Sequence, residues 1–312
     1  MGSRSASRAC WVAALVLFPT LGWGQPTPTL EEPPHAAAAV MPLIEDLGSA
    51  DHSTRHAAAM ALRELGPLAW PAVPALRRTL SDPNHHVRAS SAGALGGIGA
   101  AAQGAVPDLA RALEDPHRFV RSWAAMALAE IGPPAHGSAS ALAGMLHGDQ
   151  ENLRGRAWCA DALGRVDAPP EIAVPALIRA LQDPSEEVRS TAVLSLEKLG
   201  PQAAARGAVP PLVESLQDPH WNVRGNASCA LPRLGSEAAA AVSALGTLLR
   251  DTSPYVRGCA ARALGEIGAP AAAEASRLRE LFADRDPHVR ETARAAFGAL
   301  SRTLSDPTHR RR

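Results

Sequence analysis

Acidic and basic side chains recur six residues apart along this chain, a pairing that general acid–base catalysis can use. The pairs are Asp82 and Arg88, Asp115 and Arg121, Asp183 and Arg189, Asp218 and Arg224, Asp251 and Arg257, and Asp284 and Arg290. A catalytic site needs such a pair once, whereas this chain carries it six times at a regular interval. The spacing therefore indicates a repeated structural feature, and we expect no catalytic residue among these pairs.

The arginines mark a repeat that runs along most of the chain. Arg55, Arg88, Arg121, Arg156, Arg189, Arg224, Arg257 and Arg290 are 33, 33, 35, 33, 35, 33 and 33 residues apart. A Leu (Phe in the last copy) stands seven residues after each Arg, and another aliphatic residue stands ten after it. The fourth copy has two candidate arginines, Arg154 and Arg156, and only Arg156 keeps the apolar positions aligned. We assign Arg156 to the repeat, because burying the apolar residues contributes more free energy than placing one surface cation. The regularity predicts an array of about eight repeats.

Each repeat is predicted to form two helices. The first is typified by AVPALRRTL (Ala72–Leu80), whose apolar residues share one helical face. An Asp-Pro pair follows in most repeats, and we expect Asp to be the N-cap of the second helix and Pro to lie in its first turn. A Gly in the left-handed conformation is expected to end the second helix in six of the eight copies. Pro67, Pro133 and Pro201 prevent its continuation, and Pro232 is expected to bend the sixth one.

This pattern resembles the HEAT family, in particular the short HEAT-like repeats first associated with phycobilin lyases. The resemblance is carried by DPNHHVRASSAGALGGIG, DPSEEVRSTAVLSLEKLG and DTSPYVRGCAARALGEIG, and it covers about residues 36–300. It implies an all-α fold, a right-handed α-α superhelix (α-solenoid), with the second helices lining a concave side that usually binds partners. It also implies a ladder in which Asp and Arg of neighbouring repeats bond, from which the first repeat departs by having Ser49 at the Asp position.

Each second helix has a second stripe beside its buried one, at positions −2, +2, +5 and +9 from the Arg. These positions share a helical face, which we expect to line the groove because a two-layer solenoid buries only one face of each helix. The stripe contains Phe119, Trp123, Met126, Arg154, Trp158, Asp161, Arg165 and, in the seventh repeat, Tyr255. Neighbouring helices lie about 8–10 Å apart, so Trp123 and Trp158 are predicted to form one surface typical of a protein-binding hot spot. The alternative is that both indoles pack under adjacent loops.

Histidine and cysteine are the remaining candidates for metal binding or covalent chemistry. His85, His86, His117, His220 and His288 lie at helix starts in different repeats, without a second ligand four residues further on. We therefore expect solvated surface histidines, no metal site and no cofactor. Cys159 falls on the buried stripe, and Cys229 and Cys259 are three residues out of phase in adjacent repeats. Helix spacing and rise place these two roughly 11 Å apart, so we predict no disulfide.

The N-terminal segment differs in composition from the repeats. Arg4 and Arg8 precede an apolar run that ends near Trp23, and Gly22 and Gly24 stand at the −3 and −1 places of a cut before Gln25. This pattern is typical of a secretory signal peptide, residues 1–24, and the alternative is a buried or interfacial helix. Residues 25–35 are predicted to be a Pro-rich spacer and residues 301–312 a basic tail. The protein is accordingly expected to be exported, periplasmic or extracellular.

Composition narrows the function further. Basic and acidic residues are equal in number, 31 of each, and lack the basic stripe of a nucleic-acid binder. No nucleophile–base motif, Gly-rich phosphate loop or metal-ligand cluster is found. The sequence thus favours an exported, monomeric, non-enzymatic scaffold that binds a protein or peptide, without stable membrane insertion once the signal is removed. The alternatives are a HEAT-like enzyme of the lyase or hydroxylase class and, third, a HEAT-like nucleic-acid-binding protein.

Overall fold

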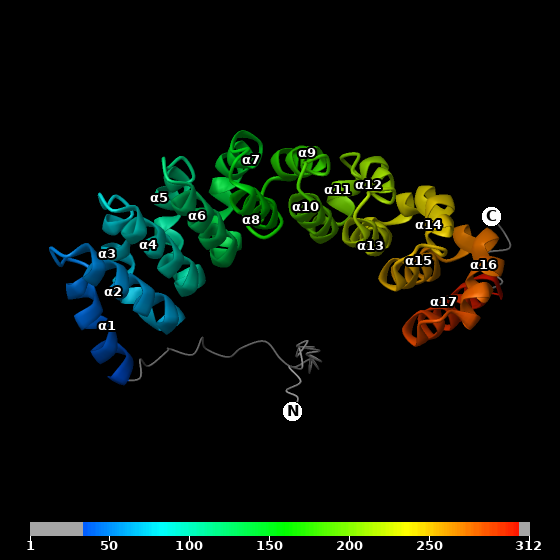
Figure 1. Cartoon of the computed structure of the whole chain (residues 1–312), viewed down its shortest axis with the longest axis horizontal. Coiled ribbons are helices and arrows are strands. Elements are labelled where there is room, and N and C mark those ends of the chain that lie inside the picture. The colour runs from blue at the N-terminus through cyan, green and yellow to red at the C-terminus, as the bar shows by residue number, and fades with distance from the viewer. Residues whose placement is uncertain (1–33, 306–312) are drawn as a thin grey trace, which may run out of the picture. The chain divides into compact units, whose positions relative to one another are not determined.

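The structure is a computed structural model that describes residues 34–305, and these residues form helices placed in two layers (Figure 1). The outer layer contains α1 (Pro34–Asp46), α3 (Val73–Thr79), α5 (Val106–Ala112), α7 (Ala139–Gly148), α9 (Pro170–Ala180), α12 (Val209–Ser215), α14 (Val242–Leu248) and α16 (Ala275–Glu280). The inner helices, on the concave side of the curved array, are α2 (His52–Leu65), α4 (His85–Ile98), α6 (Arg118–Ile131), α8 (Leu153–Leu163), α10 (Glu186–Leu199), α13 (Trp221–Ala230), α15 (Pro254–Ile267) and α17 (Pro287–Ser305). The predicted all-α repeat fold is confirmed.

The core lies between the two layers and follows the predicted periodicity. The Leu seven residues after the Arg that marks each repeat (the frame Arg) is fully buried in the first seven repeats, as in Leu62, Leu128 and Leu196. Each inner helix also packs against the next inner helix along the array, from α2 with α4 to α15 with α17. Small residues dominate this contact, since alanines such as Ala92 and Ala127 are completely buried. Alanine lets helix backbones approach closely, which explains how a chain with few aromatics fills a core of this length.

Glycine ends the inner helices as predicted. Gly66, Gly99, Gly132, Gly200, Gly235 and Gly268 all have positive φ, between 52° and 93°. After Gly the chain enters a 3₁₀ turn, such as η1 (Gly66–Ala72) or η3 (Pro133–Ser138), that leads into the next outer helix; after Gly200 the short helix α11 (Pro201–Ala204) takes this place. In the fourth repeat Asp167 stands at the position of this Gly and adopts φ 53°. Asp tolerates the left-handed region better than most residues, so the turn is kept.

The predicted role of the Asp-Pro pair is wrong in detail. Asp82 is not the N-cap of α4, because Asn84 caps that helix by accepting from the backbone N–H of His86. Asp82 lies two residues earlier and accepts the backbone N–H of Asn84, which is an Asx turn, while Pro83 occupies the turn and not the helix. The carboxylate is therefore free to bind an arginine as well as to shape the loop.

The sixth inner helix is shortened at the expected place. Helix α13 ends at Ala230, and Leu231–Leu234 continue as the 3₁₀ turn η4. Pro232 has no N–H to donate to the helix, which accounts for the change from α to 3₁₀ geometry.

Two boundaries differ from the sequence prediction. The first helix begins at Pro34, inside the expected spacer, and α17 continues to Ser305, beyond the expected end of the array at residue 300. The predicted signal peptide and the remainder of the C-terminal tail lie outside the described residues. Within residues 34–305 no helix combines the length and the apolar character needed to cross a membrane.

Candidate functional site

A cavity of about 520 Å³ opens on the inner helices α6, α8 and α10. Its walls are formed by Phe119, Ser122, Trp123, Met126, Arg154, Ala157, Trp158, Asp161, Glu187, Thr191 and Leu194. Six of the eight residues predicted to form the binding groove are therefore brought together here. A further hollow of about 370 Å³ shares Asp161, Thr191 and Leu194 and extends the groove toward Arg233, beyond the end of α13.

Trp123 is held in place from the preceding repeats. A Cβ atom on Gly93 would lie 2.8 Å from Cε3 of Trp123, so the benzene edge of the indole rests on the bare backbone of α4. The guanidinium of Arg63 lies 4.5 Å from the centre of the same ring. This stacking is a cation–π contact with the face of the indole. Trp123 is thus a preorganised, half-buried side chain, and neither it nor Trp158 is sealed inside the core.

Apolar and charged groups alternate around the cavity. Met126 is buried and forms part of the floor, while Leu194 and Phe119 are large apolar side chains that remain 40% and 51% exposed. Asp161 accepts from Arg165 at 2.9 Å and from Lys198 at 2.8 Å, so its charge is neutralised by two cations. Apolar area that is exposed and rimmed by polar groups is typical of a binding surface.

Arg154 and Glu187 line the cavity as charged side chains without an ion-pair partner among the described residues, in contrast to Asp161. Neither side chain has a hydrogen bond within the part of the chain that the structure describes. Arg156, two residues after Arg154, is 98% buried and bonded to Asp183 at 2.9 Å, which agrees with its assignment to the repeat frame. The fourth repeat therefore has one arginine, Arg156, that bonds to the next repeat and another, Arg154, that lines the cavity.

The N-terminal end of α8 is tied to α6 by a buried amide. Asn152 caps α8 by accepting from the backbone N–H of Gly155, and it also accepts from the Ser122 hydroxyl at 2.9 Å. Its amide nitrogen donates to the Arg118 carbonyl at 3.0 Å. Ser122 and Ala157 belong to the cavity but were not among the predicted residues, because they stand at position +1, beside the stripe that we assigned to the groove.

Tyr255, which was predicted to line the groove in the seventh repeat, lies outside the cavity on α6, α8 and α10. Its ring covers Gly225, and its hydroxyl donates to Asn226 at 2.8 Å. Trp221 meets the ring edge-on with centroids 5.6 Å apart. Burial raises the pKa of Tyr255, which keeps the phenol protonated as a donor. Tyr255 therefore forms a separate aromatic pair at the start of α15.

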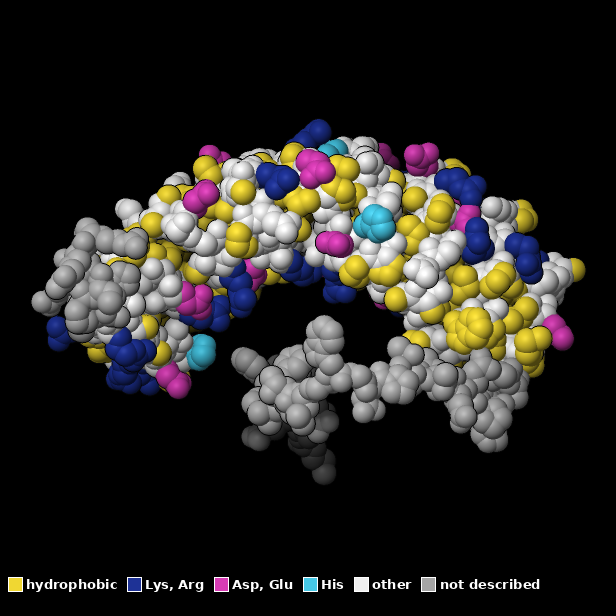
Figure 2. All heavy atoms as spheres, turned by 180° about the vertical axis from the view of Figure 1, so that it is seen from behind, with side chains coloured by type: hydrophobic (Ala, Val, Ile, Leu, Met, Phe, Trp, Pro, Cys, Tyr) yellow, Lys and Arg dark blue, Asp and Glu magenta, His cyan; other side chains and the backbone are white. Residues whose placement is uncertain are grey.

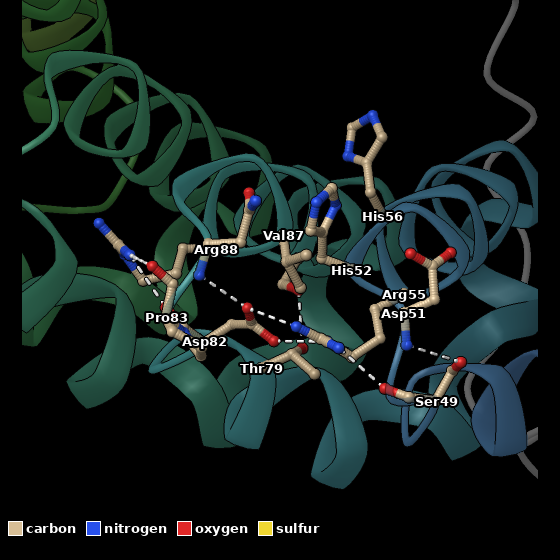
Figure 3. A network of polar contacts seen from close by, with 12 residues as sticks. Ser49, Asp51, His52, Arg55, His56, Thr79, Asp82, Pro83, Val87 and Arg88 are labelled. Atoms are coloured by element: carbon tan, nitrogen blue, oxygen red, sulfur yellow. Dashed lines mark hydrogen bonds and ion pairs between the residues drawn. The ribbon is translucent and has the colours of Figure 1, made fainter.

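The recurring Asp and Arg residues connect consecutive repeats. Arg55 reaches Asp82 through two nitrogens, at 2.7 and 3.0 Å, and donates to the Ser49 carbonyl of its own repeat (Figure 3). The same two-nitrogen contact recurs for Arg88 with Asp115, Arg156 with Asp183, Arg189 with Asp218, Arg224 with Asp251 and Arg257 with Asp284. Arg121 bonds Asp149 through Nε alone. Each carboxylate thus binds the Arg of the preceding repeat, and the pairs six residues apart meet only through the Asp backbone carbonyl. Asp149 supplies the rung that the sequence pattern missed.

These ion pairs keep the aspartates charged. Burial alone would raise the pKa of Asp115, but hydrogen bonds from Arg88 and from the backbone N–H of His117 outweigh it and hold the pKa below its ordinary value. In Asp284 the hydrogen bond from Arg257 is the largest influence, and the pKa is again lowered. In both residues the hydrogen bonds from the arginine and the backbone stabilise the ionised carboxylate.

Three of the histidines that we expected to be separate surface groups lie together. The rings of His85 and His117 stack with centroids 3.8 Å apart, and His86 lies 4.1 Å from His85. Nδ1 of His117 is buried without a hydrogen-bond partner. Within the described residues no group of three or more His, Cys, Asp or Glu side chains is arranged to hold a metal ion.

The prediction that Cys229 and Cys259 remain unbridged is wrong. They form a disulfide between α13 and α15, with Cα atoms 5.4 Å apart. Our estimate assumed that equal positions on adjacent inner helices lie opposite each other, so a difference of three positions added distance. In the structure position +5 of one inner helix faces position +2 of the next. The contact of Gly93 with Trp123 has the same offset. Arg262 donates to Sγ of Cys229 at 2.7 Å, and Cys159 is buried and free, as predicted.

The array can now be placed among known proteins. A family model described as HEAT repeats matches residues 40–129, 99–157, 150–208 and 209–298. The chain belongs to the HEAT-repeat family. Its HEAT repeats therefore account for nearly all of the described residues, including every helix that lines the cavity.

Among solved structures, this HEAT-repeat chain is similar to an engineered protein, with 24% identity over 85% of this chain and 79% of that chain, and a TM-score of 0.62. It also matches the complex of CpcE and CpcF of phycocyanin lyase from Nostoc sp. PCC7120, with 25% identity over 86% of this chain and 100% of that chain, and a TM-score of 0.47. No curated protein matches the sequence.

Proposed function

We propose that this HEAT-repeat protein is an exported, non-enzymatic scaffold whose groove on α6, α8 and α10 binds a protein or peptide partner. The observation that carries the proposal is the cavity itself, in which Trp123, Trp158 and Met126 adjoin the unpaired Arg154. Aromatic residues and arginine in a concave, partly buried site are the composition of binding hot spots. Charged side chains of both signs gather along the inner rim of the array (Figure 2), as expected for the polar border of such a site.

Export is supported by two independent features. The first is the signal-like pattern of residues 1–24, which precedes the repeats. The second is the Cys229–Cys259 disulfide, because disulfides persist mainly in oxidising compartments.

The test is affinity capture with the full chain from the periplasmic or secreted fraction of its own source. Wild type and the double variant Trp123→Ala, Trp158→Ala are compared, and we expect the double variant to retain about a hundredth of the wild-type affinity for the captured partner. Trp70→Ala is the control, because Trp70 is an exposed tryptophan that lies in η1, outside the cavity. If the double variant binds the partner as tightly as Trp70→Ala does, the groove is not the binding site.

A further inference from the structure

The disulfide between α13 and α15 lies on the concave side of the array. Cys229 and Cys259 stand at positions +5 and +2 from the frame Arg of their repeats, and both positions belong to the stripe that we assigned to the groove. Helices α13 and α15 are neighbours in the inner layer (Figure 1). Neither cysteine lines the cavity on α6, α8 and α10. The bond therefore occupies a part of the inner surface to which the proposed function assigns no role.

The two sulfur atoms of this bond differ in accessibility. Cys229 is half-buried, whereas only 5% of Cys259 is exposed. Thiol–disulfide exchange begins when a thiolate attacks one sulfur of the bond, and access helps to decide which sulfur is attacked. Attack is consequently directed to Sγ of Cys229, and Cys259 is the sulfur that leaves.

A guanidinium lies beside both sulfurs. Nη2 of Arg262 is 2.7 Å from Sγ of Cys229 and 4.0 Å from Sγ of Cys259. Arg262 also has a carboxylate neighbour, Glu266, but the two groups are 3.9 Å apart and 56% and 50% exposed, so this ion pair is weak. A cation next to a cysteine favours the thiolate, and a more stable thiolate leaves a disulfide faster. Arg262 is thus placed to stabilise either cysteine when it carries negative charge.

The two helices also have contacts that do not depend on the bond. Tyr255 of α15 covers Gly225 of α13 and donates to Asn226, and Arg224 binds Asp251, which precedes α15. Because none of these contacts involves sulfur, the reduced cysteines still face each other and can close the bond again. Such a pair is suited to reversible oxidation and reduction.

We propose that Cys229–Cys259 is a redox-active disulfide that exchanges with the cysteine pair of a partner protein, with Cys229 as the attacked sulfur and Arg262 stabilising the thiolates. One partner thiolate bonds to Sγ of Cys229, and the electron pair of the broken S–S bond goes to Cys259, which leaves as a thiolate. The second partner thiolate then attacks the partner's own sulfur in the mixed disulfide and releases Cys229. The partner's two thiols are thereby oxidised to a disulfide, and their two protons pass to Cys229 and Cys259.

The probe is a reduced synthetic peptide, Cys-Gly-Gly-Cys, added in excess to the oxidised full chain under native conditions. Cys10 is replaced by Ser throughout, so that three cysteines remain. Samples are quenched at intervals with an alkylating reagent, and mass spectrometry locates the alkylated cysteines. We expect the rate of reduction to rise in proportion to the peptide concentration and to be unchanged by low, non-denaturing urea, because the attack takes place on the folded chain.

Cys159 serves as an internal control for unfolding. Its side chain is completely buried and free, so it should stay unmodified while Cys229 and Cys259 react. Reduction that accelerates with urea, together with alkylation of Cys159, would show a bond that opens only when the chain unfolds, and would overturn the proposal.

The contribution of the guanidinium is tested by charge. Arg262→Gln should be reduced about fivefold more slowly, because the departing thiolate loses its counter-charge in a site that is partly open to solvent. Arg262→Lys keeps the charge and should retain about half of the wild-type rate or more. Arg250→Gln is the control, because Arg250 pairs with Glu280 between the outer helices and is 72% exposed, and it should react as wild type. An unchanged rate in Arg262→Gln would contradict the proposal.

Single-cysteine variants identify the attacked sulfur. Cys259→Ser leaves Cys229 beside Arg262, and Cys229→Ser leaves the buried sulfur of Cys259. Each variant is incubated with oxidised glutathione, and the mixed disulfide is detected by its added mass. We expect it to form about tenfold faster in Cys259→Ser, because access and the nearby cation both favour Cys229. Equal rates in the two variants would overturn the assignment of Cys229.

Discussion

At the scale of single residues, the frame arginine acts in two directions. Nε and Nη2 of Arg88 bind the Asp115 carboxylate of the next repeat at 2.7 and 2.9 Å, and Nη1 donates to the Asp82 carbonyl of its own repeat. Only a planar, forked guanidinium can make these bonds at once, so lysine cannot replace it. The repeated Asp-Arg pattern is thus explained by the stacking of repeats.

The first prediction concerns this rung. Asp115→Ala leaves Arg88 partly buried without its counter-ion, and we expect a loss of about 2 kcal/mol in unfolding free energy, below the loss for a fully buried pair. The Arg88 and Asp115 side chains are 14% and 10% exposed. Glu280→Ala is the control, since its pair with Arg250 is 58% and 72% exposed and should contribute less than about 0.5 kcal/mol. Urea unfolding measures both, and equal losses would contradict the structural role of the rung.

The second prediction concerns pH. Burial and the neighbouring His117 and His86 lower the pKa of His85 below the ordinary histidine value of about 6.5. Above that value the ring is neutral in both folded and unfolded chains, and stability does not depend on it. As the pH falls below 6.5, the unfolded chain takes up a proton that the folded chain resists, so stability decreases until the folded-state pKa is reached. We expect a thermal midpoint that falls between pH 7 and pH 5, and a smaller fall in His85→Gln. A His288→Gln variant should keep the wild-type slope; an unchanged slope in His85→Gln would refute the role of the stack.

At the scale of elements, the axial offset between inner helices decides which side chains meet. Position +5 of one helix faces position +2 of the next, as Gly93 faces Trp123 and Cys229 faces Cys259. Position +8 similarly faces position +6, as Gly96 faces Ala127. Helix α4 therefore has a small residue, Gly93, at the position that faces the large aromatic residue of α6, Trp123.

The third prediction follows from this offset. Gly93→Ala adds a Cβ that overlaps Trp123, and we expect a loss of about 1–3 kcal/mol despite the better helix propensity of alanine. Gly104→Ala, where no atom lies within 4 Å of the new Cβ, should change stability by less than about 0.5 kcal/mol. The two changes are compared by urea unfolding.

A cycle with Trp123→Ala identifies the cause. Once the indole is removed, Gly93→Ala should no longer be destabilising, because its clash has disappeared. The same loss in both backgrounds would place the strain somewhere other than the contact between α4 and α6.

At the scale of the whole molecule, stability is expected to be a sum over repeats and the interfaces between them. Most interfaces rely on apolar packing and one Asp-Arg rung, whereas the interface between α13 and α15 also contains a disulfide. The adjoining α13 is shortened by Pro232, so the covalent bond lies where the helical contact is reduced.

The fourth prediction is that loss of this disulfide weakens the C-terminal repeats. The bond joins residues 30 apart in sequence, for which loop-closure entropy predicts about 3–4 kcal/mol of stabilisation. Cys229→Ser with Cys259→Ser should therefore lower the unfolding free energy by about this amount. Amide hydrogen exchange should become faster in α13 and α15 and should change little in α4 and α6. An increase in exchange rate that is uniform along the array would contradict the prediction. So would a wild-type unfolding free energy that is the same with and without a reducing agent.

The sequence by itself determined the repeat frame, the two-helix unit, the buried leucines, the left-handed glycines and six residues of the cavity. These features are local or strictly periodic, so the spacing of Arg, Leu and Gly is enough to define them. Only the tertiary structure decided which Asp each Arg binds, that Cys229 meets Cys259, that His85 stacks on His117, and that Tyr255 bonds to Asn226 outside the cavity. Each of these depends on the axial offset and crossing of neighbouring helices, which arise from side-chain packing and are not encoded in the position of a residue within its own repeat.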